Sequence, residues 1–239
     1  MNKAECLQFF GVDDIMNLPK AVERVVQLPP DERDRIYREF MRMNNYEMGR
    51  DWFQRVYEEE FSQRKNQGQD FTPIEVTELC AMLAGVETAR NVHEPTAGTG
   101  QMIISAWWTW ARSRTPWESF PSQFPITVWE ILDRTIPFLL FNLSIRGIMG
   151  YVYNGDTLEK TVKRKYILLN RHDDALGFSE IIADDTGTMT IRGLPETTRR
   201  LDIPATVYVR EEPKADEPKQ IGPKQLTLFL KGCVERGSV

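Results

Sequence analysis

Residues 94–102 read Glu-Pro-Thr-Ala-Gly-Thr-Gly-Gln-Met, and this stretch decides the fold. A short apolar pattern typical of a strand precedes it, and an apolar helix pattern over residues 102–108 follows it. Strand, glycine-rich turn and helix, in that order, form a nucleotide-sized pocket in a doubly wound α/β sheet. Gly98 and Gly100 would let the backbone turn sharply and approach a ligand closely. The stretch therefore predicts an α/β fold with a binding site at this turn.

Glu94 places a negative charge at the carboxyl end of the predicted strand, beside the glycine turn. A carboxylate there would repel a pyrophosphate, whereas it would attract the sulfonium and amino groups of S-adenosylmethionine. Two glycines in one loop also occur in ordinary tight turns, so the turn alone does not separate a binding site from a structural turn. The neighbouring motifs decide between these two interpretations.

Three further motifs surround the glycine turn in a fixed order. Residues 68–73 read Gly-Gln-Asp-Phe-Thr-Pro, residues 128–133 read Val-Trp-Glu-Ile-Leu-Asp before an apolar helix pattern, and residues 154–158 read Asn-Gly-Asp-Thr-Leu. This order resembles adenine-specific DNA methyltransferases, particularly the modification subunits of type I restriction systems, over roughly residues 30–170. The resemblance implies a truncated Rossmann-like, S-adenosylmethionine-dependent methyltransferase core, with a helical N-terminal region and a short β-rich C-terminal part.

The same resemblance gives particular side chains a cofactor role. Phe71 and Thr72 would pack on the methionine side of S-adenosylmethionine, although Asp70 stands where the family has an aromatic residue. Glu130 would accept hydrogen bonds from the ribose hydroxyls and Asp156 one from the adenine amino group, because a carboxylate is an acceptor only. Without the motif order, both would be ordinary solvated carboxylates at strand ends. The predicted cofactor-binding residues are Phe71, Thr72, Glu94, Thr96, Gly98, Gly100, Glu130 and Asp156.

The catalytic signature of that family is missing at its expected place. The signature is an Asn, Asp or Ser followed by two prolines and an aromatic residue, which together hold a flipped base. Here the strand pattern over residues 165–169 ends at Asn170, and Arg171, His172 and Asp173 follow. The single Pro-Pro pair, at residues 29–30, reads instead as the start of a helix. Asn170 is therefore a degenerate candidate for the catalytic acceptor.

These departures favour a cofactor-binding protein that is inactive or weakly active alone. About 70 residues follow Asn170, fewer than the family needs to finish its sheet and to form a separate target-recognition region. One alternative is an active DNA adenine methyltransferase that uses Asn170 as a divergent acceptor, completed by another modification-system subunit. A second alternative is a non-catalytic decoy or inhibitor that acts on a restriction system or on the replisome.

Composition limits the partners and the compartment. The 239 residues carry 35 acidic and 30 basic side chains, a net charge of -5, so the chain has no global basic footprint for duplex DNA. A local basic cluster over residues 160–171 keeps DNA open as a partner, and the alternative is a solvated basic surface. Three cysteines far apart, without metal-ligand spacing, predict no metal site and a reducing compartment. No signal peptide is visible and the apolar run around residues 136–143 is too short to span a bilayer, so we expect a cytoplasmic protein.

The pattern divides the chain into four regions. They are a helical region (1–65), the methyltransferase-like core (66–174), a β-rich extension (175–210) with a hairpin pattern over residues 178–191, and a flexible tail (211–239) rich in Pro, Lys and Glu. Residues 225–229 of the tail resemble the bacterial sliding-clamp-binding motif, in which two apolar anchors enter a pocket. The predicted clamp contacts are Gln225, Leu226, Leu228 and Phe229. The alternative for this peptide is a final β-strand with one apolar face.

Overall fold

The computed structural model describes residues 1–57, 72–184 and 189–190. The chain divides into two units, Met1–Asp202 and Ile203–Val239, and every described residue belongs to the first. Phe71 and the clamp-like residues 225–229 lie outside the described residues. The four regions predicted from the sequence, with their boundaries, therefore stay a prediction.

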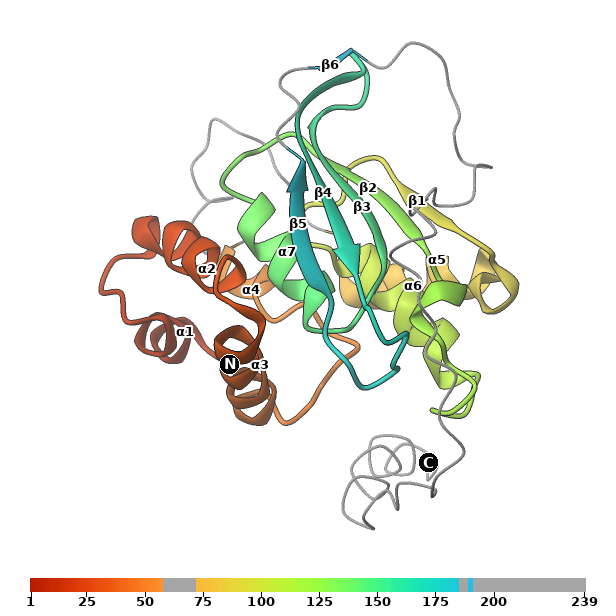
Figure 1. Cartoon of the computed structure of the whole chain (residues 1–239), viewed down its shortest axis with the longest axis horizontal. Coiled ribbons are helices and arrows are strands. Elements are labelled where there is room, and N and C mark those ends of the chain that lie inside the picture. Colours follow the sequence, from red (N-terminus) through yellow and green to blue (C-terminus); the bar gives the residue numbers. More distant parts are fainter. Residues whose placement is uncertain (58–71, 185–188, 191–239) are drawn as a thin grey trace. The chain divides into compact units, whose positions relative to one another are not determined.

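Short helices make up the N-terminal part of the chain, as its apolar spacing predicts (Figure 1). Asn2 and Glu5 form a capping box at the first helix, which ends where Gly11 adopts the left-handed conformation. Pro30 opens the third helix, as the Pro-Pro pair predicts, because a first-turn residue needs no N–H donor. These elements are α1 (Lys3–Phe10), η1 (Ile15–Asn17), α2 (Leu18–Val26), α3 (Pro30–Met43) and α4 (Gln54–Tyr57).

A sheet, with helices before and between its parallel strands, forms the rest of the described chain (Figure 1). Its order is β1-β2-β3-β4-β5, with β6 also paired to β4. The first three strands are parallel, and β4, β5 and β6 continue the sheet in antiparallel pairing. The strands are β1 (Val92–Glu94), β2 (Ile126–Glu130), β3 (Gly150–Asp156), β4 (Thr161–Leu169), β5 (Glu180–Asp184) and β6 (Met189–Thr190). The helical elements are α5 (Ile74–Leu83), η3 (Val86–Thr88), α6 (Gln101–Arg112), η4 (Pro121–Gln123) and α7 (Ile136–Ser144).

The direction of each strand follows from the length of the connection before it. Parallel neighbours need a crossover of a dozen or more residues, and α6 and α7 lie in the two crossovers that join β1, β2 and β3. Only residues 157–160 separate β3 from β4, so β4 turns back along β3. Asp156 accordingly pairs with Thr161, and Gly150 with Leu168. The C-terminal end of β4 therefore lies at the edge of the sheet where the parallel strands begin.

Aromatic rings pack the N-terminal helices onto α7. The ring of Phe141 lies 4.7 Å from that of Tyr37 and 4.9 Å from that of Phe40, centroid to centroid. The hydroxyl of Tyr37 also shares a buried hydrogen bond of 2.6 Å with Oγ of Ser144. The N-terminal helices thus belong to the same hydrophobic core as the sheet.

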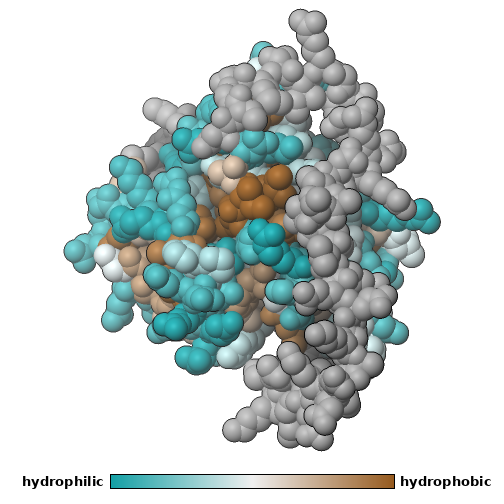
Figure 2. Space-filling model, in the orientation of Figure 1, coloured by the Kyte–Doolittle hydropathy of each residue, from teal (hydrophilic) through white to brown (hydrophobic). Residues whose placement is uncertain are grey.

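Some apolar surface stays exposed on the described part of the chain. Figure 2 shows apolar residues near the centre of the view, where Figure 1 shows the sheet. Ile182 on β5 and Leu79 and Leu83 on α5 are among the exposed large apolar side chains. In the described ranges, no helix is long and apolar enough to cross a membrane.

The predicted fold class is confirmed: an α/β core, helices before it and β-strands after it. One detail differs from the sequence pattern, which predicted a hairpin over residues 178–191. Instead, β5 and β6 both pair with β4, through Leu169 with Glu180 and through Val162 with Met189. One long strand, β4, thereby serves as the neighbour of both short strands.

Candidate functional site at the carboxyl edge of the parallel strands

Three carboxylates lie at one edge of the sheet, where the parallel strands end. Glu94 is the last residue of β1, Glu130 of β2 and Asp156 of β3. Their strands are adjacent and in register, with Glu94 opposite Val128 and Glu130 opposite Asn154. The structure thus brings together three of the side chains that the sequence motifs predicted. An edge of this kind is where ligands bind in open α/β sheets.

The glycine turn, residues 98–100, closes over the end of β2. Gly98 and Gly100 have φ of 57° and 107°, values that residues with a Cβ rarely adopt. The backbone N–H of Ala97 donates to the carbonyl oxygen of Trp129 at 2.8 Å, and that of Gly98 donates to Oε2 of Glu130 at 2.9 Å. Gly100 is the N-cap of α6, and no side chain in the described part of the chain caps this helix start. The first N–H groups of α6 are therefore not satisfied by a capping side chain.

Glu130 is the most buried of the three carboxylates, at 6% exposure. Burial raises its pKa, and the backbone N–H groups of Leu132 and Gly98 oppose that shift. Its Oε1 accepts from the N–H of Leu132 at 2.8 Å while Oε2 accepts from Gly98. A carboxylate has about four lone-pair sites, so Glu130 can brace the turn and still accept from a ligand hydroxyl.

The loops after β1 and β3 are tied to each other. Oε1 of Glu94 accepts from the backbone N–H and the hydroxyl of Thr96, both at 3.2 Å. Oδ1 of Asp156 accepts from the backbone N–H of Leu158 at 2.8 Å. The hydroxyl of Thr157 donates to the carbonyl oxygen of Pro95 at 2.7 Å, which links the two loops. These contacts fix the loops that follow Glu94 and Asp156 relative to each other.

Charge at this edge suits a ligand that carries a positive group. Asp133, in the loop after β2, adds little to this charge, because its hydrogen bond with Lys163 lowers its pKa and pairs it with a cation. In the described ranges, no cluster of three or more His, Cys, Asp or Glu could hold a metal ion. Opposite charges attract, so a sulfonium or ammonium group is favoured here over a phosphate.

Thr72 enters the structure just before α5. Its carbonyl oxygen accepts from Nε2 of Gln54 at 3.2 Å, so the segment is tied to α4. Further along, Oγ1 of Thr77 shares a buried hydrogen bond of 2.7 Å with Oγ of Ser105, which packs α5 against α6. Whether Thr72 and Phe71 reach a cofactor stays a prediction, since Phe71 lies outside the described residues.

Asn170 is not brought to this edge. It follows β4, which runs opposite to β1–β3, and therefore lies where those strands begin. Its Nδ2 donates to the carbonyl oxygen of Asp174 at 2.8 Å, and its Oδ1 accepts from the backbone N–H of Asp174 at 3.1 Å. The side chain is 3% exposed and closes the loop after β4. In the structure Asn170 thus contacts its own loop and lies at the opposite end of the strands from the described cofactor candidates, and its catalytic role stays a prediction.

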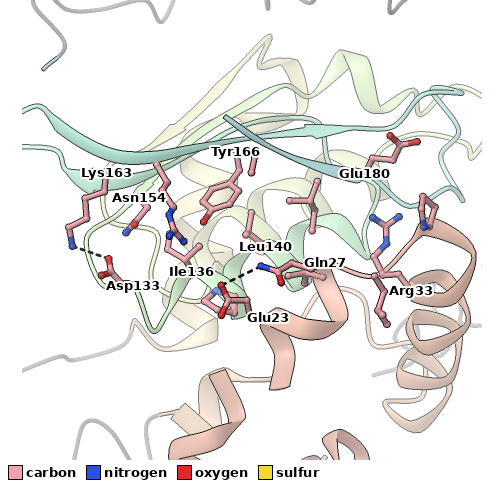
Figure 3. Close-up of a pocket in the computed structure, with 17 residues that line it drawn as sticks. Glu23, Gln27, Arg33, Asp133, Ile136, Leu140, Asn154, Lys163, Tyr166 and Glu180 are labelled. Atoms are coloured by element: carbon pink, nitrogen blue, oxygen red, sulfur yellow. Dashed lines mark hydrogen bonds and ion pairs between the residues drawn. The ribbon is translucent and has the colours of Figure 1, made fainter. Parts of the chain in front are cut away.

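A cavity of about 590 Å³ lies between the sheet and helices α2, α3 and α7 (Figure 3). Ile136, Leu140 and Tyr166 contribute to its lining, and Nζ of Lys163 pairs with Oδ1 of Asp133 at 2.9 Å on its rim. None of the described cofactor candidates lines it. Its charged lining is balanced, with Glu23, Asp133 and Glu180 against Arg33, Lys163 and Arg164. The cavity therefore does not include the three strand-end carboxylates, and its lining shows no preference for an anion or a cation.

Together, the parallel strands, the glycine turn and the acidic edge define a truncated methyltransferase-type domain. Comparison with known proteins agrees with that class. Residues 48–179 match the family described as N-6 DNA Methylase, and the chain belongs to this family.

One solved structure with similarity is described as a modification subunit of a type I restriction enzyme from Vibrio vulnificus YJ016. It is 16% identical, the match covers 55% of this chain and 25% of that subunit, and the TM-score is 0.38. The chain thus spans about a quarter of the length of that subunit. A search of curated proteins gave no match.

Proposed function

We propose that this protein binds S-adenosylmethionine at the carboxylate edge and transfers no methyl group to DNA, or transfers it only weakly, when alone. Membership of the N-6 DNA Methylase family supports S-adenosylmethionine as the methyl donor. The residues present fit the molecule. Glu94 and the neighbouring acids suit its sulfonium and amino groups, Glu130 its ribose, and the uncapped start of α6 its carboxylate.

The observation that carries the inactive part of the proposal is the direction of β4. Methyl transfer to an exocyclic amine needs the target nitrogen held in line with the methyl group, by an acceptor close to the cofactor. The four-residue connection 157–160 sends β4 away from that edge and places Asn170 at the other end of the strand. The side chain of Asn170 is also hydrogen-bonded to the backbone of Asp174 in the loop after β4.

Calorimetric titration with S-adenosylmethionine tests the first half of the proposal, and labelled methyl transfer to adenine in DNA tests the second. We expect binding without appreciable incorporation. Asn170→Ala serves as the control, since it should lower thermal stability and leave cofactor affinity unchanged. Absence of any binding heat at millimolar cofactor would refute the cofactor site. Strong incorporation that Asn170→Ala abolishes would instead establish the alternative of an active enzyme.

Partners and location extend the proposal beyond the described residues. DNA and another modification-system subunit are the partners that the family favours, and addition of such a subunit in the transfer assay separates a complete enzyme from a decoy. The tail residues Gln225, Leu226, Leu228 and Phe229 would tether the protein to the bacterial sliding clamp. Each of these partners belongs in the bacterial cytoplasm, where we place the protein.

A further inference from the structure

A buried hydrogen-bond network made by Asp51, Asn142 and Arg146 contacts the glycine turn, and we call it the Asn142 brace. Asn142 is 0% exposed. Its Nδ2 donates to the carbonyl oxygen of Thr99 at 2.8 Å and to Oδ1 of Asp51 at 2.7 Å. Thr99 stands between the two glycines of the turn. One amide group on α7 therefore joins the turn to the N-terminal part of the chain.

Arg146 fixes the direction in which the Asn142 amide points. Its Nη1 donates to Oδ1 of Asn142 at 3.2 Å and to the backbone oxygen of the same residue at 2.6 Å. A guanidinium only donates, so Oδ1 must face Arg146 and Nδ2 must face the turn. Burial lowers the pKa of Arg146 to about 9, which leaves the group charged at neutral pH. A reversed amide would place donor against donor.

The brace also fixes the chain just before α4. Arg146 donates from Nε to the carbonyl oxygen of Met48 at 2.8 Å and from Nη2 to that of Arg50. The backbone N–H of Asp51 donates to Oε1 of Gln101, the first residue of α6, at 2.7 Å. Residues 48–51 are thereby bonded to Arg146, which follows α7, and to the helix that the glycine turn starts.

Among the described residues, two buried atoms at the contact between the brace and the turn have no partner in standard hydrogen-bond geometry. They are Oδ2 of Asp51 and Oγ1 of Thr99. Burial raises the pKa of Asp51, and the nearby Thr99 hydroxyl is the first of the groups that oppose the shift. The carboxyl group of Asp51 and the hydroxyl of Thr99 therefore face each other where the brace contacts the turn.

We propose that Asn142 is a positioning residue for cofactor binding, oriented by Arg146 and Asp51. It holds the carbonyl of Thr99, and with it the glycine turn and the start of α6, in the arrangement that receives the cofactor. Residues 48–51 then contribute to the cofactor site through their bonds to the brace. This inference rests on the proposed function. A network with only a structural role would stabilise the fold equally well without setting the affinity for the cofactor.

The test compares two variants that remove buried side-chain hydrogen bonds made by the same helix, α7. Asn142→Leu cuts the link to the turn, whereas Tyr37→Phe cuts the bond of 2.6 Å to Ser144 and leaves the turn untouched. We expect Asn142→Leu to raise the Kd for S-adenosylmethionine at least tenfold and to speed amide hydrogen exchange of residues 97–103 without ligand. Tyr37→Phe should keep the Kd and the exchange rates within twofold of the wild type, even if its Tm falls as much as that of Asn142→Leu.

A second pair of variants covers the case in which Asn142→Leu does not fold. Asp51→Asn keeps an oxygen for the Asn142 amide and should retain affinity within threefold, whereas Asp51→Ala should lose it as Asn142→Leu does. Equal affinity and equal exchange in the wild type and the folded brace variants would overturn the inference. If the wild type binds no cofactor, the proposed function fails. Amide exchange of residues 97–103 still tests the brace in that case, because equal exchange in the wild type and the folded brace variants would refute it.

Discussion

Replacing Glu130 by Gln distinguishes two roles of this residue, stabilising the glycine turn and binding the cofactor. The change keeps the size of the side chain and one oxygen, but it puts an NH₂ group against a backbone N–H of either Gly98 or Leu132. A hydrogen bond to a charged group contributes about 1.5–3 kcal/mol, and loss of the buried negative charge returns part of this. We therefore expect the free energy of unfolding at neutral pH to fall by about 1–2 kcal/mol.

Cofactor affinity should fall as well, if Glu130 accepts from the ribose. Loss of one such bond corresponds to roughly 10- to 100-fold in Kd, since about 1.4 kcal/mol is a factor of ten. Urea unfolding followed by circular dichroism gives the stability, and calorimetric titration gives the affinity.

Glu94→Gln is the matched control for stability, because its bonds of 3.2 Å stay within its own loop and its loss should cost less than about 0.5 kcal/mol. Unchanged stability in Glu130→Gln would refute the bracing role of this carboxylate. Lower stability with unchanged affinity would show that Glu130 only stabilises the turn, and it would refute the contact with the ribose.

Three other substitutions test separate parts of the chain. Gly150→Ala should cost more than about 3 kcal/mol of unfolding free energy, because φ is +145° and a Cβ would overlap the backbone of Ile126; a Tm near that of the wild type would contradict this. Burial raises the folded pKa of Asp51, so its carboxyl favours the folded state below the ordinary carboxyl pKa and loses that contribution as the pH rises through the folded value. Asp51→Asn should therefore gain stability relative to the wild type as the pH rises from about 4 to 7, and a flat difference in urea titrations would argue against it. Replacing Leu228 and Phe229 by Ala should abolish binding to purified sliding clamp with almost no change in Tm, whereas a lower Tm without clamp binding would favour the β-strand alternative.

The order of the motifs was enough to predict the acidic edge. Parallel strands end at the same side of a sheet, so a motif acid at the end of each predicted strand had to meet the others. Glu94, Glu130 and Asp156 do so. The hydrogen bond from Gly98 to Glu130 could not be predicted, because it depends on how the turn folds over a neighbouring strand.

The family pattern predicted Asn170 close to the cofactor residues, but the short connection before its strand indicated otherwise. Only residues 157–160 lie between Asp156 and the next strand, and a parallel crossover cannot be made in that length. The brace residues Asn142 and Arg146 were missed as well. Their signal was two polar side chains, with Ser144 between them, in an otherwise apolar pattern, since buried polar groups need hydrogen-bond partners.

The short connection between β3 and β4 also bears on the order in which the sheet assembles. Contacts between β3, β4 and β5 are local, and hairpins form in about 1–10 μs, whereas pairing of β1 with β2 must first close a loop that contains α6. We expect the antiparallel half to be protected early during refolding, and the edge that carries Glu94 and the glycine turn to be protected last. Pulse-labelling hydrogen exchange would show this order, and simultaneous protection of β1 and β4 would exclude it. A newly made chain would then acquire its antiparallel strands before it acquires a place for a ligand.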